Sequence, residues 1–99
     1  KPMATYFVTR HGGALDWAAR HNVMIDRALS HLRIEEIRPG DVVIGILPVH
    51  LAAEICAKPA RYIQIAMDLP EERRGIELSA DDMERHHARL VEYRVERAR

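Results

Sequence analysis

The stretch Val42-Val43-Ile44-Gly45-Ile46-Leu47 decides the fold. Its residues are apolar at odd and even positions alike, so a strand formed here would be buried on both faces. Such a strand is typical of the centre of a parallel sheet. Pro48 follows directly, and proline is favoured in the first turn of a helix, where its missing N–H costs nothing. The stretch therefore predicts a central strand at 42–47 and a helix over 49–57.

Further strands are expected on both sides of this centre. Short apolar, aromatic or β-branched runs predict strands at 5–9, 23–25 and 61–67. Alternation at 93–96 predicts a last strand at an edge of the sheet.

The helices alternate with these strands. Helical periodicity predicts a helix at 14–21, with Asp16 and Arg20 paired on its outer face. Residues 28–38 fit a helical turn or two better than a strand, and a last helix with a capping-box start is expected to run from Ser79 to Val91. The order β-α-β-(α)-β-α-β-α-β predicts an α/β fold with a mainly parallel central sheet flanked by helices.

Size and composition favour one domain at 3–99 in a chain of 99 residues, 47% of them apolar. Lys1-Pro2 is expected to be a remnant of recombinant expression, with Met3 as the natural start. The longest apolar run, at 42–49, is far too short for a membrane span, and no signal peptide is visible. The single Cys56 excludes an internal disulfide, so we expect a cytoplasmic protein.

The charge balance bears on the ligand. The net charge is zero, which weighs against binding of a long nucleic acid. Thirteen of the 15 basic residues are arginine, which holds phosphate in a bidentate fork. A GC-rich genome would produce the same bias, so the functional interpretation is reserved for individual arginines at strand ends. A small anionic ligand in a local pocket is compatible with this pattern.

Three strand ends are expected to form one site, because ligands of open parallel sheets bind outside the carboxyl ends of the strands. The candidate residues are Thr9, Arg10, His11, Gly12 and Gly13 after the first strand, Gly45, Ile46, Leu47, Pro48 and Val49 at the central strand, and Asp68, Arg73 and Arg74 after the fourth.

The first of these ends has the strongest chemical signal. Gly12 and Gly13 permit close backbone approach at the start of a helix, whose free N–H groups suit a phosphate. Arg10 adds a full charge and His11 a titratable group. Neither a dinucleotide-binding fingerprint nor a Walker loop is present, and a plain turn between strand and helix explains the glycines equally well.

Purely structural interpretations stay open for the residues at the ends of the central and fourth strands. The apolar segment at 45–49 fits core packing and a helix start, Asp68 fits a cap, and Arg73 and Arg74 fit a solvated run paired with neighbouring glutamates. The histidines show no metal-ligand spacing, so neither a metal nor a cofactor is expected.

An ordered set of segments resembles a small family of CRISPR-associated proteins from type III systems, the family numbered sixteen in the Csx series. The similar segments include 6–11, 13–17, 39–41, 43–45, 47–49, 51–54, 60–62, 68–70, 74–75 and 77–79, and they span nearly the whole chain. Ile46 stands where that family is expected to have a small polar residue, and Pro59 stands in place of an expected glycine.

The resemblance implies a prokaryotic ring nuclease with a small Rossmann-like domain, similar to the CARF domains that bind cyclic oligoadenylate. It implies a homodimer that binds this ligand, usually cyclic tetra-adenylate, in a composite site. The ring would be cut without a metal by attack of a ribose 2′-OH on the phosphodiester, leaving 2′,3′-cyclic phosphate ends. The cleavage would switch off the antiviral signal of type III CRISPR defence.

Roles for the candidate residues follow from this hypothesis. Arg10 and Arg74 would neutralise phosphate charge, and His11 would act as general acid or base. Gly12 and Gly13 would cradle a phosphate, residues 45–49 would form a wall for adenosine, and Asp68 would hold a ribose hydroxyl or orient Arg10. Two alternatives stay open: a sensor or sponge that binds the ring without cutting it, and an interaction domain whose strand-end residues are only caps and solvated charges.

Overall fold

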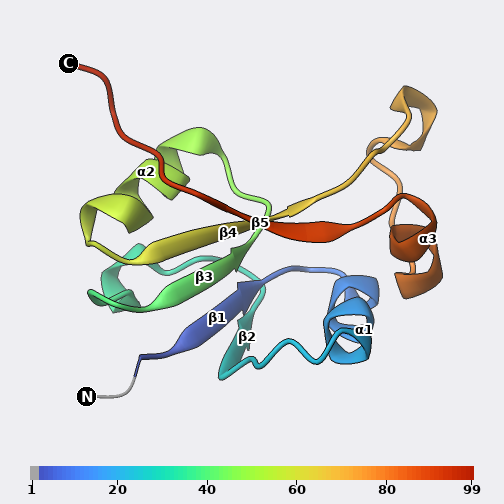
Figure 1. Cartoon of the computed structure of the whole chain (residues 1–99), viewed down its shortest axis with the longest axis horizontal. Coiled ribbons are helices and arrows are strands. Elements are labelled where there is room, and N and C mark those ends of the chain that lie inside the picture. Colours follow the sequence, from blue (N-terminus) through green and yellow to red (C-terminus); the bar gives the residue numbers. More distant parts are fainter. Residues whose placement is uncertain (1–2) are drawn as a thin grey trace.

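The computed structural model describes residues 3–99, so the expectation for Lys1-Pro2 lies outside the described residues. These residues form one five-stranded sheet with three α-helices packed on it (Figure 1). In chain order the elements are β1 (Thr5–Val8), α1 (Gly12–Arg20), β2 (Arg27–Leu29), the 3-10 helix η1 (Ile34–Glu36), β3 (Val42–Gly45), α2 (Val49–Ala57), β4 (Arg61–Ala66), the 3-10 helix η2 (Glu71–Arg73), α3 (Ala80–Arg85) and β5 (Arg89–Tyr93). The predicted α/β class is confirmed, and the arrangement is that of a small Rossmann-like fold.

The sheet has the strand order β2-β1-β3-β4-β5. β1 pairs in parallel with β2 and with β3, β3 pairs in parallel with β4, and only β5 is antiparallel to its neighbour β4. The chain first moves outward from β1 to β2 and then crosses back to β3. The order therefore reverses between β1 and β3, which is where open α/β sheets leave a crevice for ligands.

Two apolar layers cover the two faces of the sheet. One contains α1 and α3, with Phe7, Trp17 and Met83 among its buried side chains. The other contains α2 and the residue that follows η1, with Tyr62 and Ile55 among its buried side chains. All four residues of β3 are buried, which confirms that the apolar run identified in the sequence marks the centre of the sheet.

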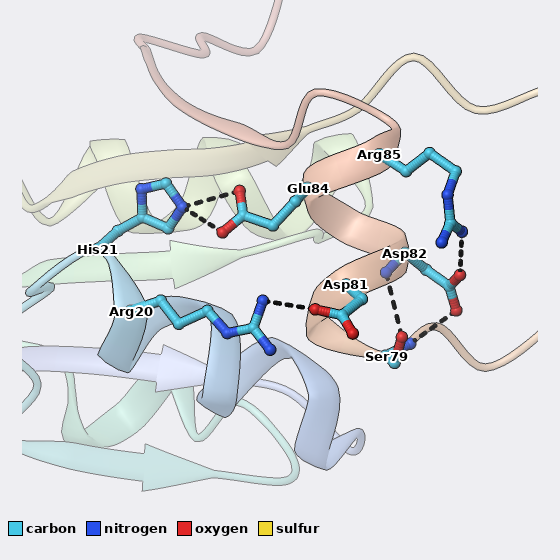
Figure 2. Close-up of polar contacts among 7 residues, drawn as sticks. All are labelled: Arg20, His21, Ser79, Asp81, Asp82, Glu84 and Arg85. Atoms are coloured by element: carbon cyan, nitrogen blue, oxygen red, sulfur yellow. Dashed lines mark hydrogen bonds and ion pairs between the residues drawn. The ribbon is translucent and has the colours of Figure 1, made fainter.

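Polar contacts join α1 to α3 on the first face (Figure 2). Arg20 Nη1 lies 2.8 Å from Asp81 Oδ1, and His21 Nε2 lies 3.0 Å from the Glu84 carboxylate. The predicted capping box is present, since the Ser79 hydroxyl accepts from the Asp82 N–H and the Asp82 carboxylate accepts from the Ser79 N–H, both at 3.1 Å. Asp16, the predicted partner of Arg20, contributes only a weaker charge interaction, because the Arg20 guanidinium donates its hydrogen bond to Asp81 of α3.

The second strand does not lie where the sequence indicated. Residues 23–25 form an irregular segment whose Val23 and Ile25 pack on the core, and β2 begins four residues later at Arg27. β2 is an edge strand with mostly exposed residues, so it lacks the apolar signature of the buried strands. The helical turn expected within 28–38 is present only as the 3-10 helix η1, and Ala28 and Leu29 lie in β2 instead.

The last helix and strand are also displaced from their predicted positions. α3 ends at Arg85, and His87 has a φ of 60°, a left-handed conformation that cannot continue a helix. Leu90 and Val91, expected on the helix, lie in β5 instead. The last strand, predicted at 93–96, lies at 89–93 instead, and only Tyr93 is common to both ranges, because pairing with β4 and not the local sequence pattern sets its position.

Smaller differences concern element ends near the carboxyl edge of the sheet. β1 ends at Val8, α1 begins at Gly12, and β3 ends at Gly45. Ile46 and Leu47 therefore leave the sheet before α2 begins. Among residues 3–99, no helix has the length and apolar character needed to cross a membrane.

Candidate functional site

A cavity of about 640 Å³ opens at the carboxyl edge of the sheet, where the strand order reverses. Its volume falls in the range of roughly 300–1,000 Å³ that is typical of small-molecule sites. It is lined by Val8, Thr9, Arg10, His11, Ala14, Ser30, His31, Leu32, Ile46, Leu47, Pro48, Leu51, Ile65, Met67, Gly75, Ile76, Glu77, Leu78 and Met83. The expected convergence of strand ends on one edge of the sheet is therefore present in the structure.

The end of β1 contributes three consecutive residues to this cavity. Thr9 still follows the sheet, since its N–H donates to the Leu29 carbonyl at 2.9 Å. Its hydroxyl accepts from the His11 N–H at 3.1 Å and so shapes the turn into α1. Arg10 and His11 are both exposed, and His11 Nδ1 lies 3.8 Å from the Glu77 carboxylate across the cavity rim.

The N-terminus of α1 lies beside these residues. His11 is its N-cap residue, but the His11 side chain makes no capping hydrogen bond, and no acidic residue occupies the first turn. The partial positive charge of the helix end therefore meets no carboxylate within its own first turn. Ala14 of this turn lines the cavity.

The two glycines of this turn differ in their surroundings. A Cβ on Gly13 would lie 2.1 Å from the Leu78 carbonyl oxygen, whereas a Cβ on Gly12 would have no atom within 4 Å. Gly13 therefore allows the start of α1 to pack on the backbone that precedes α3. Neither glycine is among the residues that line the cavity, so their role as a phosphate cradle stays a prediction.

An apolar wall forms the side of the cavity that follows β3. Ile46, Leu47 and Pro48 line it, whereas Val49 is exposed outside it. Gly45 is buried between strands, where an added Cβ would lie 2.9 Å from the Val8 carbonyl oxygen. Gly45 thus permits close packing of β1 and β3, and it is not among the residues that line the cavity.

A buried tyrosine holds this wall in place. The Tyr62 hydroxyl accepts from the Leu47 N–H at 3.1 Å and donates toward the Gly45 carbonyl oxygen at 3.3 Å. Burial raises the pKa of Tyr62, so the hydroxyl keeps its proton at neutral pH. The buried Tyr62 hydroxyl therefore fixes the backbone at the end of β3 and just beyond it.

The third predicted cluster is only partly at the cavity. Met67 and residues 75–78 line it, but Asp68, Arg73 and Arg74 do not. Asp68 Oδ1 lies 3.1 Å from Arg89 Nη1, and its other oxygen lies 3.4 Å from His87 Nδ1.

These contacts differ from what the sequence suggested. The recorded ion-pair partners of Asp68 come from β5 and the turn before it and do not include Arg10, so the role of Asp68 at the site stays a prediction. Arg73 does not pair with its neighbouring glutamates, since its Nη2 lies 3.4 Å from Asp82 Oδ1.

Three polar residues that line the cavity were not predicted from the sequence: Ser30, His31 and Glu77. Ser30 and His31 directly follow β2, so the rule of strand ends would have found them had β2 been placed correctly. Glu77 lies in an irregular segment and carries no local signal. The polar side chains thus come mainly from the segments that follow β1 and β2, and the apolar ones mainly from the segment after β3, the end of β4, α2, α3 and the segment before α3.

Within residues 3–99, no group of three or more His, Cys, Asp or Glu side chains is placed to hold a metal ion. The charged groups that line the cavity are Arg10 and Glu77, together with the two imidazoles of His11 and His31. This arrangement can contact an anion, form hydrogen bonds to hydroxyls and transfer protons.

Comparison with protein-family models gives a match over residues 6–96, to a family described as "Putative CRISPR-associated protein (Cas_VVA1548)". The chain belongs to this family. No curated protein and no solved structure matches the chain. The match supports the CRISPR association that the sequence segments indicated, and it covers every residue that lines the cavity.

Proposed function

We propose that this CRISPR-associated protein is a ring nuclease, which binds cyclic oligoadenylate and cleaves it. The observation that carries the proposal is the cavity at the reversal of strand order, because it has a charged side and an apolar side. A nucleotide has the same division, with an anionic phosphate and a flat base. Membership of a CRISPR-associated family favours a nucleotide messenger over other ligands of this chemical kind.

Phosphate binding is assigned to the first strand end. Arg10 supplies a full positive charge at the cavity, and the uncapped N-terminus of α1 lies next to it. In the same proposal Arg74, beside the lining residue Gly75, approaches a phosphate at the mouth of the cavity. Adenine packs against the apolar wall formed by Ile46, Leu47 and Pro48.

Cleavage requires no group beyond the ring itself and these side chains. The ribose 2′-oxygen forms a bond to phosphorus, the bond from phosphorus to the 5′-oxygen breaks, and a 2′,3′-cyclic phosphate and a 5′-OH result. His11 transfers one of the two protons involved, and Arg10 stabilises charge on the phosphoryl oxygens. Glu77 replaces Asp68 as the carboxylate that holds a ribose hydroxyl, because Glu77 lines the cavity and Asp68 is paired elsewhere.

A homodimer is the second part of the proposal. The cavity of one chain is about 640 Å³ and open to one side, and a two-fold axis would place two of them against one pseudo-symmetric ring. Ile46 and Ile76 line the cavity and are exposed, and they would be covered in such an assembly. Light scattering with and without ligand measures the mass directly, and a monomer in both conditions would contradict a composite site.

The deciding experiment uses radiolabelled cyclic tetra-adenylate with the purified protein in EDTA. Linear products that end in a 2′,3′-cyclic phosphate are the expected result. Intact ring that co-elutes with the protein would replace the ring nuclease with a sensor or sponge. Intact ring without binding would leave only the CRISPR-associated family and the fold.

A further inference from the structure

His31 lies in the cavity although nothing in its local sequence marked it. β1 and β2 are parallel neighbours with Val8 opposite Leu29, and the Thr9 N–H donates to the Leu29 carbonyl at 2.9 Å. His31 follows the end of β2 by two residues, and His11 follows the end of β1 by three. Both histidines line the same cavity. Two adjacent strand ends therefore bring two imidazoles to one site.

Cleavage by a ribose hydroxyl needs two proton transfers at different places. The attacking 2′-oxygen and the leaving 5′-oxygen stand on opposite sides of phosphorus in an in-line displacement. One group must take the proton from the 2′-OH, and another must give a proton to the 5′-oxygen as it leaves. A single histidine at the end of β1 supplies only one of these groups.

Few lining residues can supply the second one. The titratable or charged groups that face the cavity are Arg10, His11, His31 and Glu77. Arginine stays protonated and cannot act as a base. The Glu77 carboxylate lies 3.8 Å from His11 Nδ1, so it is placed beside that imidazole and does not supply a second group at a separate position. His31 is exposed to the cavity and makes no ion pair with any residue of the described chain.

We propose that His31 is a catalytic residue, the second member of a proton-transfer pair with His11, and this inference rests on the proposed function. One imidazole accepts the 2′-OH proton while the 2′-oxygen bonds to phosphorus. The other, starting as imidazolium, donates its proton to the 5′-oxygen as the phosphorus–oxygen bond breaks. Both return to their starting states by exchange with water. Histidine suits both roles because its side chain titrates near neutral pH.

The test measures single-turnover cleavage of cyclic tetra-adenylate by the full chain carrying His31→Gln. We expect the rate to fall by about 10²–10⁴-fold, as for loss of a general acid or base. Binding is measured separately with cyclic tetra-deoxyadenylate, which lacks the 2′-OH and cannot be cut, and its affinity should change by less than about threefold. His50→Gln is the matched control, because His50 is exposed on α2 and does not line the cavity.

Two readouts separate catalysis from a structural effect. The wild-type rate should depend on pH with both an ascending and a descending limb, and His31→Gln should lose one of them. A ring whose bridging 5′-oxygen is replaced by sulfur has a leaving group that needs no proton. If His31 is the acid, this ring restores the rate of the variant; if His31 is the base, the rate stays low and the ring instead restores His11→Gln.

The outcomes distinguish the two proposals. Cleavage by the wild type and equally fast cleavage by His31→Gln would overturn the role of His31 and leave the ring nuclease intact. A slow His31→Gln variant that keeps both pH limbs, together with a sulfur-substituted ring that restores neither His31→Gln nor His11→Gln, would make His31 a merely structural residue and would overturn the inference too. No cleavage by the wild type would overturn both proposals together.

Discussion

Two regions of the molecule treat their charged side chains in opposite ways. Where α1 meets α3, Arg20 pairs with Asp81 at 2.8 Å and His21 with Glu84 at 3.0 Å (Figure 2). At the cavity, Arg10 and His31 have no ion-pair partner among residues 3–99, and His11 has only a long contact of 3.8 Å with Glu77. Charges that hold elements together are matched within the fold, so unmatched charges at strand ends are the ones available to a ligand.

The two regions also differ in what stabilises them. The contact of α1 with α3 rests on buried side chains such as Trp17, Ala18 and Met83, and the ion pairs above them are largely exposed. Exposed ion pairs contribute little because water screens them. We therefore expect substitutions at the cavity to change binding without changing stability, and substitutions in the α1–α3 region to do the reverse.

The largest effect is expected from Arg10→Ala, on ligand binding. Loss of a hydrogen bond to a charged phosphate should cost about 1.5–3 kcal/mol, or roughly ten- to hundredfold in affinity. The free energy of unfolding should change by less than about 0.5 kcal/mol, since Arg10 is exposed. Titration with cyclic tetra-deoxyadenylate and urea denaturation measure the two quantities.

Arg94→Ala is the control for Arg10, because Arg94 is also exposed and lies outside the cavity. Equal loss of affinity in both variants would mean that Arg10 acts only through the overall charge. A large loss of stability in Arg10→Ala would remove the contrast between the two regions.

Gly13→Ala should have the next largest effect, and it should act on stability. The new Cβ would lie 2.1 Å from the Leu78 carbonyl oxygen, so the backbone at the start of α1 must move away from α3. We expect a loss of about 1–3 kcal/mol, as for other overpacked sites. The matched variant Gly12→Ala meets no atom within 4 Å and should be neutral or slightly stabilising. Equal denaturation midpoints for the two variants would contradict this contact.

The parts of the fold that could be predicted from sequence are those with a local apolar signature. β1, β3 and β4 pair with strands on both sides, and their apolar runs identify them although their ends shift by one or two residues. β2 and β5 are edge strands with mostly exposed residues, so their positions depend on pairing with a neighbour. No pattern within a short window contains that information.

The same distinction explains the candidate site. Arg10 and His11 were found because β1 was found, and His31 was missed because β2 was misplaced. The partners of Asp68 could not be predicted, since Arg89 comes from β5, 21 residues later, and reaches Asp68 only through the antiparallel pairing. Chemistry that follows a buried strand is visible in the sequence, whereas side-chain pairing across elements depends on the tertiary fold.

A smaller effect is expected where the α3 capping box is removed. Ser79→Ala deletes the hydroxyl that accepts from the Asp82 N–H, and it should cost about 1 kcal/mol. Ser30→Ala is the matched control on the cavity side, where Ser30 is exposed, and it should change stability by less than about 0.5 kcal/mol. Thermal denaturation of the two variants compares the regions directly.

The capping box also predicts a pH dependence of stability. The pKa of Asp82 is lowered to about 2, first by the Ser79 backbone N–H and then by Arg85 and the Ser79 hydroxyl. The pKa of Asp82 is lower in the folded chain than in the unfolded chain. The stabilisation that the ionised Asp82 carboxylate gives the fold is therefore present above about pH 4 and is lost as the pH falls toward 2. In Asp82→Asn, the free energy of unfolding should fall less steeply between about pH 4 and pH 2. An unchanged fall in this variant would show that other carboxylates cause it.

The smallest effect is expected from the pair of Arg20 and Asp81. The Asp81 hydrogen bond raises the pKa of Arg20, yet both side chains are about half or more exposed, at 47% and 74%. A double-mutant cycle with Arg20→Ala and Asp81→Ala should therefore give a coupling well below the effect of Ser79→Ala, and it should vanish in 1 M salt, where charges are screened over about 3 Å. A strong, salt-resistant coupling would mean that the matched charges, and not the buried side chains beneath them, hold α1 to α3. Charged side chains would then be essential in both regions, for stability where α1 meets α3 and for ligand binding at the cavity.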